Sequence, residues 1–121
     1  MARVCELVSV KFGLIFGDYD VQKDHEFLNV SVYPLLGFNG RIGLTLIQVL
    51  QLRDHLLNLD SDCRIVGLEE QDRSEIITTE VWESYDETYN PSWIELAACK
   101  FNPDARVSVY VKLPKSIWNH E

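Results

Sequence analysis

The clearest alternation of hydrophobic and polar residues lies near the C-terminal end of the chain, at residues 106–113. The apolar set is Val107, Val109, Val111 and Leu113, and the polar set between them is Arg106, Ser108, Tyr110 and Lys112. A period of two residues is typical of a strand in an antiparallel sheet with one buried face and one face in water. We therefore predict a strand here, with its polar set on the wetted face.

Other segments are rich in β-branched and aromatic residues, which favour strands. These segments are 3–12, 26–34, 63–68, 75–82 and 93–101. Polar, proline-containing or glycine-containing segments separate them and predict loops or turns, at 17–25, 34–40, 69–74 and 102–105. We predict a strand at each of the apolar segments.

A period close to 3.6 residues runs through residues 45–59 and predicts a helix. Thr45 and Gln48 match a capping box, in which the two side chains satisfy backbone N–H groups at a helix start. One half of the helical wheel carries the apolar stripe, with Ile47 as the exception: Leu46, Val49, Leu50, Leu52, Leu56, Leu57 and Leu59. The stripe is wider than a coiled-coil seam, which favours packing across a sheet.

Together these patterns predict an α+β fold in a single domain that spans residues 1–121. We expect a mostly antiparallel sheet of about five or six strands, with the helix at 45–59 packed across one face. A chain of 121 residues is long enough to bury one stable core. The sequence has no internal repeat, low-complexity tract or linker that would divide it.

Arg53 interrupts the apolar stripe of the predicted helix. A cation there costs free energy unless its head reaches water or pairs with a carboxylate. Glu6 and Glu95 are candidates for a bidentate pair, because each interrupts an otherwise apolar predicted strand. In either case we expect a structural rather than a catalytic role for Arg53.

The formal net charge of −8 is concentrated in residues 60–95. This window holds eleven carboxylates against only Arg64 and Arg73. An acidic chain is not expected to bind nucleic acid directly, since that requires Lys and Arg along the phosphates. The charge instead favours a positively charged protein partner.

The same window contains an aromatic and acidic segment, residues 82–93. We expect Trp82 and Trp93 in the core, where tryptophan is usually buried. Tyr85 and Tyr89 lie in a polar stretch and are expected in a loop, either as interface anchors or as residues that pin the loop. The predicted partner-binding residues are Glu69, Glu70, Asp72, Glu83, Tyr85, Asp86, Glu87 and Tyr89.

Oxygen ligands are close together in residues 18–26, which resemble the start of a calcium loop. Lys23 and Asn29, however, occupy the positions where such a loop needs glycine and a bidentate glutamate. We therefore interpret residues 18–26 as a solvated loop. Neither a metal nor a cofactor is expected.

Residues that could act as nucleophiles or bases have no recognisable setting. No G-x-S-x-G motif is present, and the histidines are expected to be exposed: His25, His55 and His120. Paired carboxylates such as Glu69 and Glu70 are expected by chance in so acidic a window. The sequence therefore gives no support to an enzyme.

The cysteines and the apolar runs favour a cytoplasmic protein. Cys5, Cys63 and Cys99 cannot all pair within one chain and include no C-x-x-C spacing. Glu6 and Lys11 interrupt the N-terminal apolar stretch, which a secretory signal would keep uncharged. No run of 18 apolar residues is present, so no contact with a membrane is expected.

In general character, as a small acidic chain without recognisable catalytic residues, the protein is similar to two groups of inhibitors. These are bacterial immunity proteins, which neutralise a cognate toxin by binding it, and phage-encoded inhibitors of nucleic-acid-handling complexes. The similarity is one of composition. It implies a stoichiometric toxin inhibitor, and an immunity protein is the first choice. The alternatives are a phage inhibitor or nucleic-acid mimic, and a small enzyme whose site shows no motif.

Overall fold

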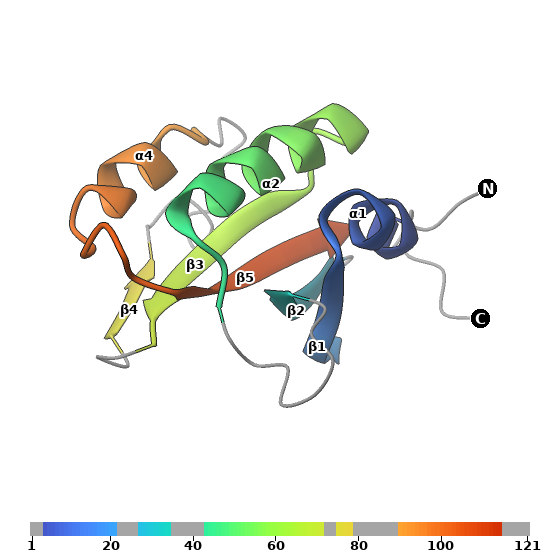
Figure 1. The fold of residues 1–121 in the computed structure, drawn as a ribbon. Coiled ribbons are helices and arrows are strands. Elements are labelled where there is room, and N and C mark those ends of the chain that lie inside the picture. Colours follow the sequence, from blue (N-terminus) through green and yellow to red (C-terminus); the bar gives the residue numbers. More distant parts are fainter. Residues whose placement is uncertain (1–3, 22–26, 35–42, 72–74, 79–89, 115–121) are drawn as a thin grey trace.

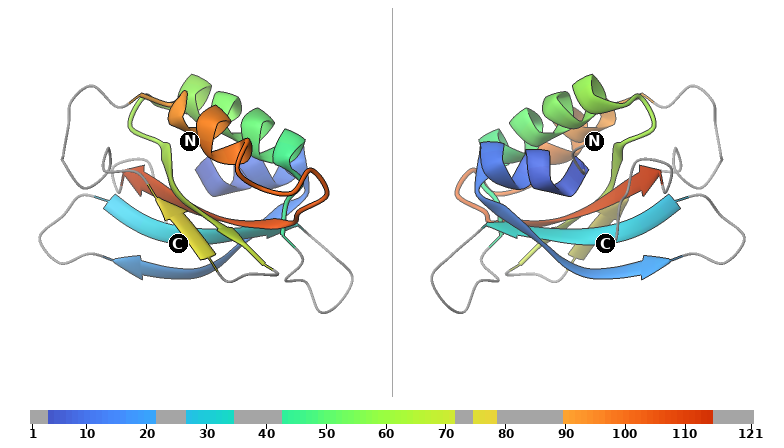
Figure 2. Two further views of the ribbon diagram at one scale, coloured as in Figure 1. Left: turned by 90° about the vertical axis from the view of Figure 1, so that its left-hand side faces the viewer. Right: turned by 90° about the vertical axis from the view of Figure 1, so that its right-hand side faces the viewer.

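A computed structural model describes residues 4–21, 27–34, 43–71, 75–78 and 90–114. In chain order the elements are α1 (Val4–Phe12), β1 (Leu14–Val21), β2 (Phe27–Pro34), α2 (Leu46–Leu59), β3 (Arg64–Glu70), β4 (Glu75–Thr78), α4 (Trp93–Ala98) and β5 (Val107–Pro114). They form two layers, with all three helices on the same face of the sheet (Figures 1 and 2). The predicted α+β class is therefore confirmed.

The sheet has the strand order β1-β2-β5-β3-β4, and each neighbouring pair is antiparallel. β5 lies at the centre. In its middle, Val111 pairs with Val30 of β2 and with Ile65 of β3, and all three side chains are buried. Such rows of β-branched side chains form the apolar face on which the helices pack.

Helix α2 begins at its predicted capping box. The Thr45 N–H donates to Gln48 Oε1 at 2.9 Å, and the Gln48 N–H donates to Thr45 Oγ1 at 3.2 Å. Val49, Leu52 and Leu56 are buried against the sheet. The exposed Ile47 (69%) is the exception that the helical wheel predicts. The main helix and its packing on the strands are therefore confirmed.

The strand predicted at residues 3–12 is wrong, because the chain forms α1 there. In a strand Val8 and Val10 would share a face, but Val8 is fully buried and Val10 is 87% exposed. Val8 and Phe12, four residues apart, both pack against the core. β-Branched residues favoured a strand by propensity, and packing overrides that preference. The sheet instead begins with β1, which extends into the predicted loop at 17–25.

The strand predicted at residues 93–101 is also wrong, because residues 93–98 form α4. Trp93, Ile94 and Ala97 are buried at helical spacing. The burial expected for Trp93 is thereby confirmed. Trp82 lies outside the described residues.

The remaining strands lie close to their predicted positions. β3 extends through Glu70 into the predicted turn at 69–74, and β4 occupies the start of the segment 75–82, of which residues 79–82 lie outside the described part. The turn predicted at 102–105 is present, since the Ala105 N–H donates to the Asn102 carbonyl at 2.8 Å.

The predicted strand at 106–113 is confirmed as β5, but its polar side is not uniformly wetted. Ser108 and Lys112 are buried, and Lys112 is only 5% exposed. Because β5 is the central strand, Lys112 is flanked by Asn29 of β2 and by Arg64 of β3. A central position shields side chains that an edge strand would leave in water.

Candidate functional site

Two of the predicted partner-binding residues, Glu69 and Glu70, belong to β3. Glu69 is half-buried and accepts a hydrogen bond from the Tyr110 hydroxyl at 2.7 Å, whereas Glu70 is only 4% exposed. A carboxylate as buried as Glu70 presents little surface to a partner. The other predicted residues lie outside the described part of the chain: Asp72, Glu83, Tyr85, Asp86, Glu87 and Tyr89.

The elements on either side of the aromatic and acidic segment lie at one end of the molecule. β4 precedes the segment and α4 follows it, and both lie at the left of Figure 1, β4 in the sheet and α4 in the helical layer. β4 is also the last strand of the described sheet on that side. The fold therefore presents both flanks of this acidic segment on the same side.

Exposed carboxylates also occur on the helical layer. The side chains of Asp54 in α2 and Glu95 in α4 are 65% and 59% exposed. Asp62, in the turn between α2 and β3, is exposed as well. Sequence patterns did not single out Asp54 and Glu95 as a pair, because they are 41 positions apart and only the α2–α4 packing brings them together.

Arg53 joins these two carboxylates. Its Nε donates to Asp54 Oδ1 at 2.9 Å and its Nη1 to Glu95 Oε2 at 3.0 Å. Its side chain is 12% exposed, and while burial lowers the pKa of Arg53, the hydrogen bonds to Asp54 and Glu95 outweigh burial and raise it. Of the two candidate partners, Glu95 contacts Arg53, but it lies on a helix rather than in the sheet, is exposed, and makes a contact that is not bidentate.

The face of the sheet opposite the helices carries a second polar set. Gln71 Nε2 donates to Ser108 Oγ at 3.3 Å, beside the Tyr110–Glu69 hydrogen bond. The pKa of Tyr110 is raised to about 12. Burial is the largest cause, and the hydrogen bond to Glu69 is the second. Burial and the nearby charge of Arg64 lower the pKa of Lys112. The hydrogen bonds of Tyr110 with Glu69 and of Gln71 with Ser108 join β5 to β3 and to the residue that follows it, and Tyr110 remains neutral at pH 7.

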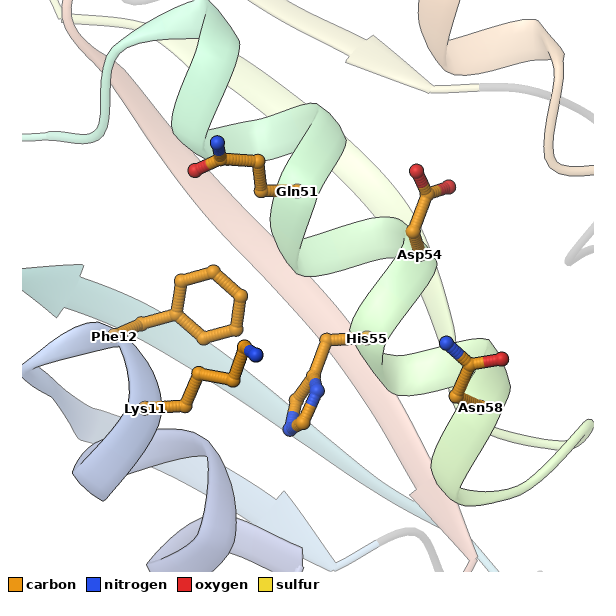
Figure 3. A pocket seen from close by; sticks show the side chains of 6 residues that line it. All are labelled: Lys11, Phe12, Gln51, Asp54, His55 and Asn58. Carbon is orange, nitrogen blue, oxygen red and sulfur yellow. The ribbon is translucent and has the colours of Figure 1, made fainter.

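A groove with a volume of about 460 Å³ lies between α1 and α2 (Figure 3). One wall is a face of α2, whose lining residues recur every three or four positions: Gln51, Asp54, His55 and Asn58. Lys11 and Phe12, at the end of α1, form the other wall. The groove was not predicted, because its second wall exists only when residues 4–12 form a helix.

His55 faces α1 across this groove (Figure 3). Its ring contacts Phe12 edge-on, with 5.3 Å between the ring centroids. Its Nε2 is shielded from water and has no hydrogen-bond partner within the described ranges. Burial first, and then the charge of Lys11, lowers the pKa of His55. The prediction that His55 is an exposed histidine is therefore wrong.

Comparison with known proteins finds no matching family model, no matching curated protein and no matching solved structure. Among the described residues, no group of three or more His, Cys, Asp or Glu side chains is arranged to hold a metal ion. No described helix is both long enough and apolar enough to span a membrane.

Proposed function

We propose that the protein is a non-enzymatic stoichiometric inhibitor, most simply a bacterial immunity protein, that binds a positively charged toxin or effector in the cytoplasm. The observation that carries this proposal is the concentration of the chain's negative charge in residues 60–95. Carboxylates around aromatic anchors steer a basic partner toward the surface, while the rings supply the desolvated centre of the contact.

The arrangement of the helices and strands supports the proposal. β4 and α4, which flank the acidic segment, lie on one side of the molecule, and Glu95 on α4 is exposed there. We assign Tyr85, Asp86, Glu87 and Tyr89 foremost to the contact, together with Asp72 and Glu83. Glu69 is retained at the margin and Glu70 is left out, because its side chain is buried in the free protein.

The test is a pull-down of the partner followed by a comparison of two variants. Combining Tyr85→Ala, Asp86→Asn, Glu87→Gln and Tyr89→Ala should abolish binding and leave the thermal unfolding curve nearly unchanged. Either tyrosine change alone should weaken binding by at least about 2 kcal/mol if that ring is an anchor.

The control removes two charges at the other end of the molecule. Asp60→Asn with Asp62→Asn alters the turn between α2 and β3, far from α4 and β4 in Figure 1. This variant should bind the partner almost as tightly as the original chain. Tight binding by the fourfold variant would exclude the proposed surface.

A further inference from the structure

The groove between α1 and α2 has a cation, Lys11, on its α1 wall and a carboxylate, Asp54, on its α2 wall. Asp54 is paired with Arg53 at 2.9 Å, and the lowered pKa of His55 keeps its ring neutral at pH 7. Lys11 is exposed and forms no ion pair with any described residue. The α1 wall of the groove therefore offers an ammonium group that pairs with no described carboxylate, on a chain of net charge −8. An anion would be favoured at this wall, beside Lys11.

The groove also provides a flat apolar wall beside that charge. The ring of Phe12 is partly buried and lies against His55, next to Lys11 (Figure 3). Aromatic rings pair favourably with other rings in edge-to-face or offset arrangements. A ligand with a planar ring would therefore contact Phe12 while its anionic group lies near Lys11.

The dimensions fit a molecule rather than a simple ion. The volume of about 460 Å³ lies within the range of about 300–1,000 Å³ that is common for small-molecule sites. Gln51 and Asn58 are seven residues apart on α2, a rise of ~10 Å, and their amides can donate to or accept from a ligand along that length. His55 Nε2, which lacks a partner in the described part of the chain, is a further group that a ligand could pair with after the imidazole rotates.

We propose that the groove is a binding site for a small anion that carries an aromatic ring, such as an aromatic carboxylate. Its anionic group pairs with Lys11 and its ring packs against Phe12. This inference does not depend on the proposed protein partner, whose contact is assigned to other residues of the chain.

Three probes separate charge from shape: phenylacetate, benzylamine and acetate. Phenylacetate has the ring and the anion, benzylamine has the ring with a cation, and acetate has the anion alone. Titration followed by backbone and imidazole NMR should show saturable shifts at Lys11, Phe12 and His55 with phenylacetate. A dissociation constant on the order of 1 mM is expected for so small a probe. Benzylamine and acetate should each bind at least about tenfold more weakly.

Lys11→Gln should weaken phenylacetate binding about tenfold, because it removes the charged partner of the carboxylate. The matched control is Lys100→Gln, which removes an exposed lysine that follows α4, and it should leave binding unchanged. The fourfold variant of residues 85, 86, 87 and 89 should also bind phenylacetate normally, so failure of one proposal does not imply failure of the other. Equal binding of phenylacetate and benzylamine, or no saturable shift in the groove up to about 10 mM, would overturn the inference.

Discussion

The side chain of Arg53 combines a buried stem with a guanidinium that is held at the protein surface. Its two partners, Asp54 and Glu95, are both more than half exposed. Exposed ion pairs contribute little to stability, because water already solvates the carboxylates. Arg53 therefore links α2 to α4 through weak contacts rather than through a buried salt bridge.

Arg53→Met tests this interpretation. The change keeps most of the stem volume and leaves two carboxylates that water can solvate, so the free energy of unfolding should fall by less than about 1 kcal/mol. Denaturant unfolding of Arg53→Met, Glu95→Gln and the double variant would measure the coupling between the two residues. A loss of several kcal/mol would show that the pair is effectively buried. Loss of partner binding by a stable Arg53→Met variant would instead place Arg53 in the interface.

At the scale of elements, α2 packs its apolar stripe against β3 and β5. Leu56 is buried on its stripe, while Ile47 projects into water from the same helix. Leu56→Ala should lower the free energy of unfolding by roughly 2 to 5 kcal/mol, as truncation of a buried leucine does. Ile47→Ala is the matched control and should cost less than about 0.5 kcal/mol. If denaturant unfolding shows that the two variants lose equal free energy, α2 is rotated and does not bury the face that carries Leu56.

The contact between α1 and α2 should depend on pH through His55. Its pKa is lowered in the folded protein, so the unfolded chain binds the proton more readily. Stability should therefore fall as the pH drops below about 6.5, the unperturbed value, and the loss should level off once the folded form is also protonated.

The control for this pH prediction is the His55→Gln variant, whose side chain is polar but does not titrate. Carboxylates titrate in both proteins, so the difference between their unfolding curves at about pH 7 and about pH 5 isolates the imidazole. Lys11→Gln should raise the pKa of His55, measured by NMR titration of the imidazole, because it removes a nearby positive charge. An unchanged pKa in that variant would contradict the contact between α1 and α2.

At the scale of the whole molecule, the distribution of charge governs association. The net charge of −8 should accelerate encounter with a basic partner at low ionic strength. Association should slow as salt rises, because screening acts over about 10 Å at about 0.1 M salt. Stopped-flow association rates at several salt concentrations would measure this effect. A rate independent of salt would contradict electrostatic steering.

The sequence by itself determined the elements whose signals are local and repeated. The alternation at Val107, Val109 and Val111 predicted β5, and the capping box of Thr45 and Gln48 predicted the start of α2. In both cases neighbouring residues carry the information, since a pleated strand and a helical turn each have a fixed period. The concentration of charge in residues 60–95 was equally visible in the sequence.

Only the tertiary structure decided that residues 4–12 and 93–98 form short helices. It also decided where the sites that depend on these helices lie. Helices of nine and six residues, α1 and α4, are marginal on their own, so their packing against the core outweighs the strand preference of valine and isoleucine. The partner of Arg53, the burial of Lys112 at the centre of the sheet and the groove around His55 then follow from contacts between distant parts of the chain. Such contacts leave no periodic signal in one sequence, because their geometry exists only once the layers have packed together.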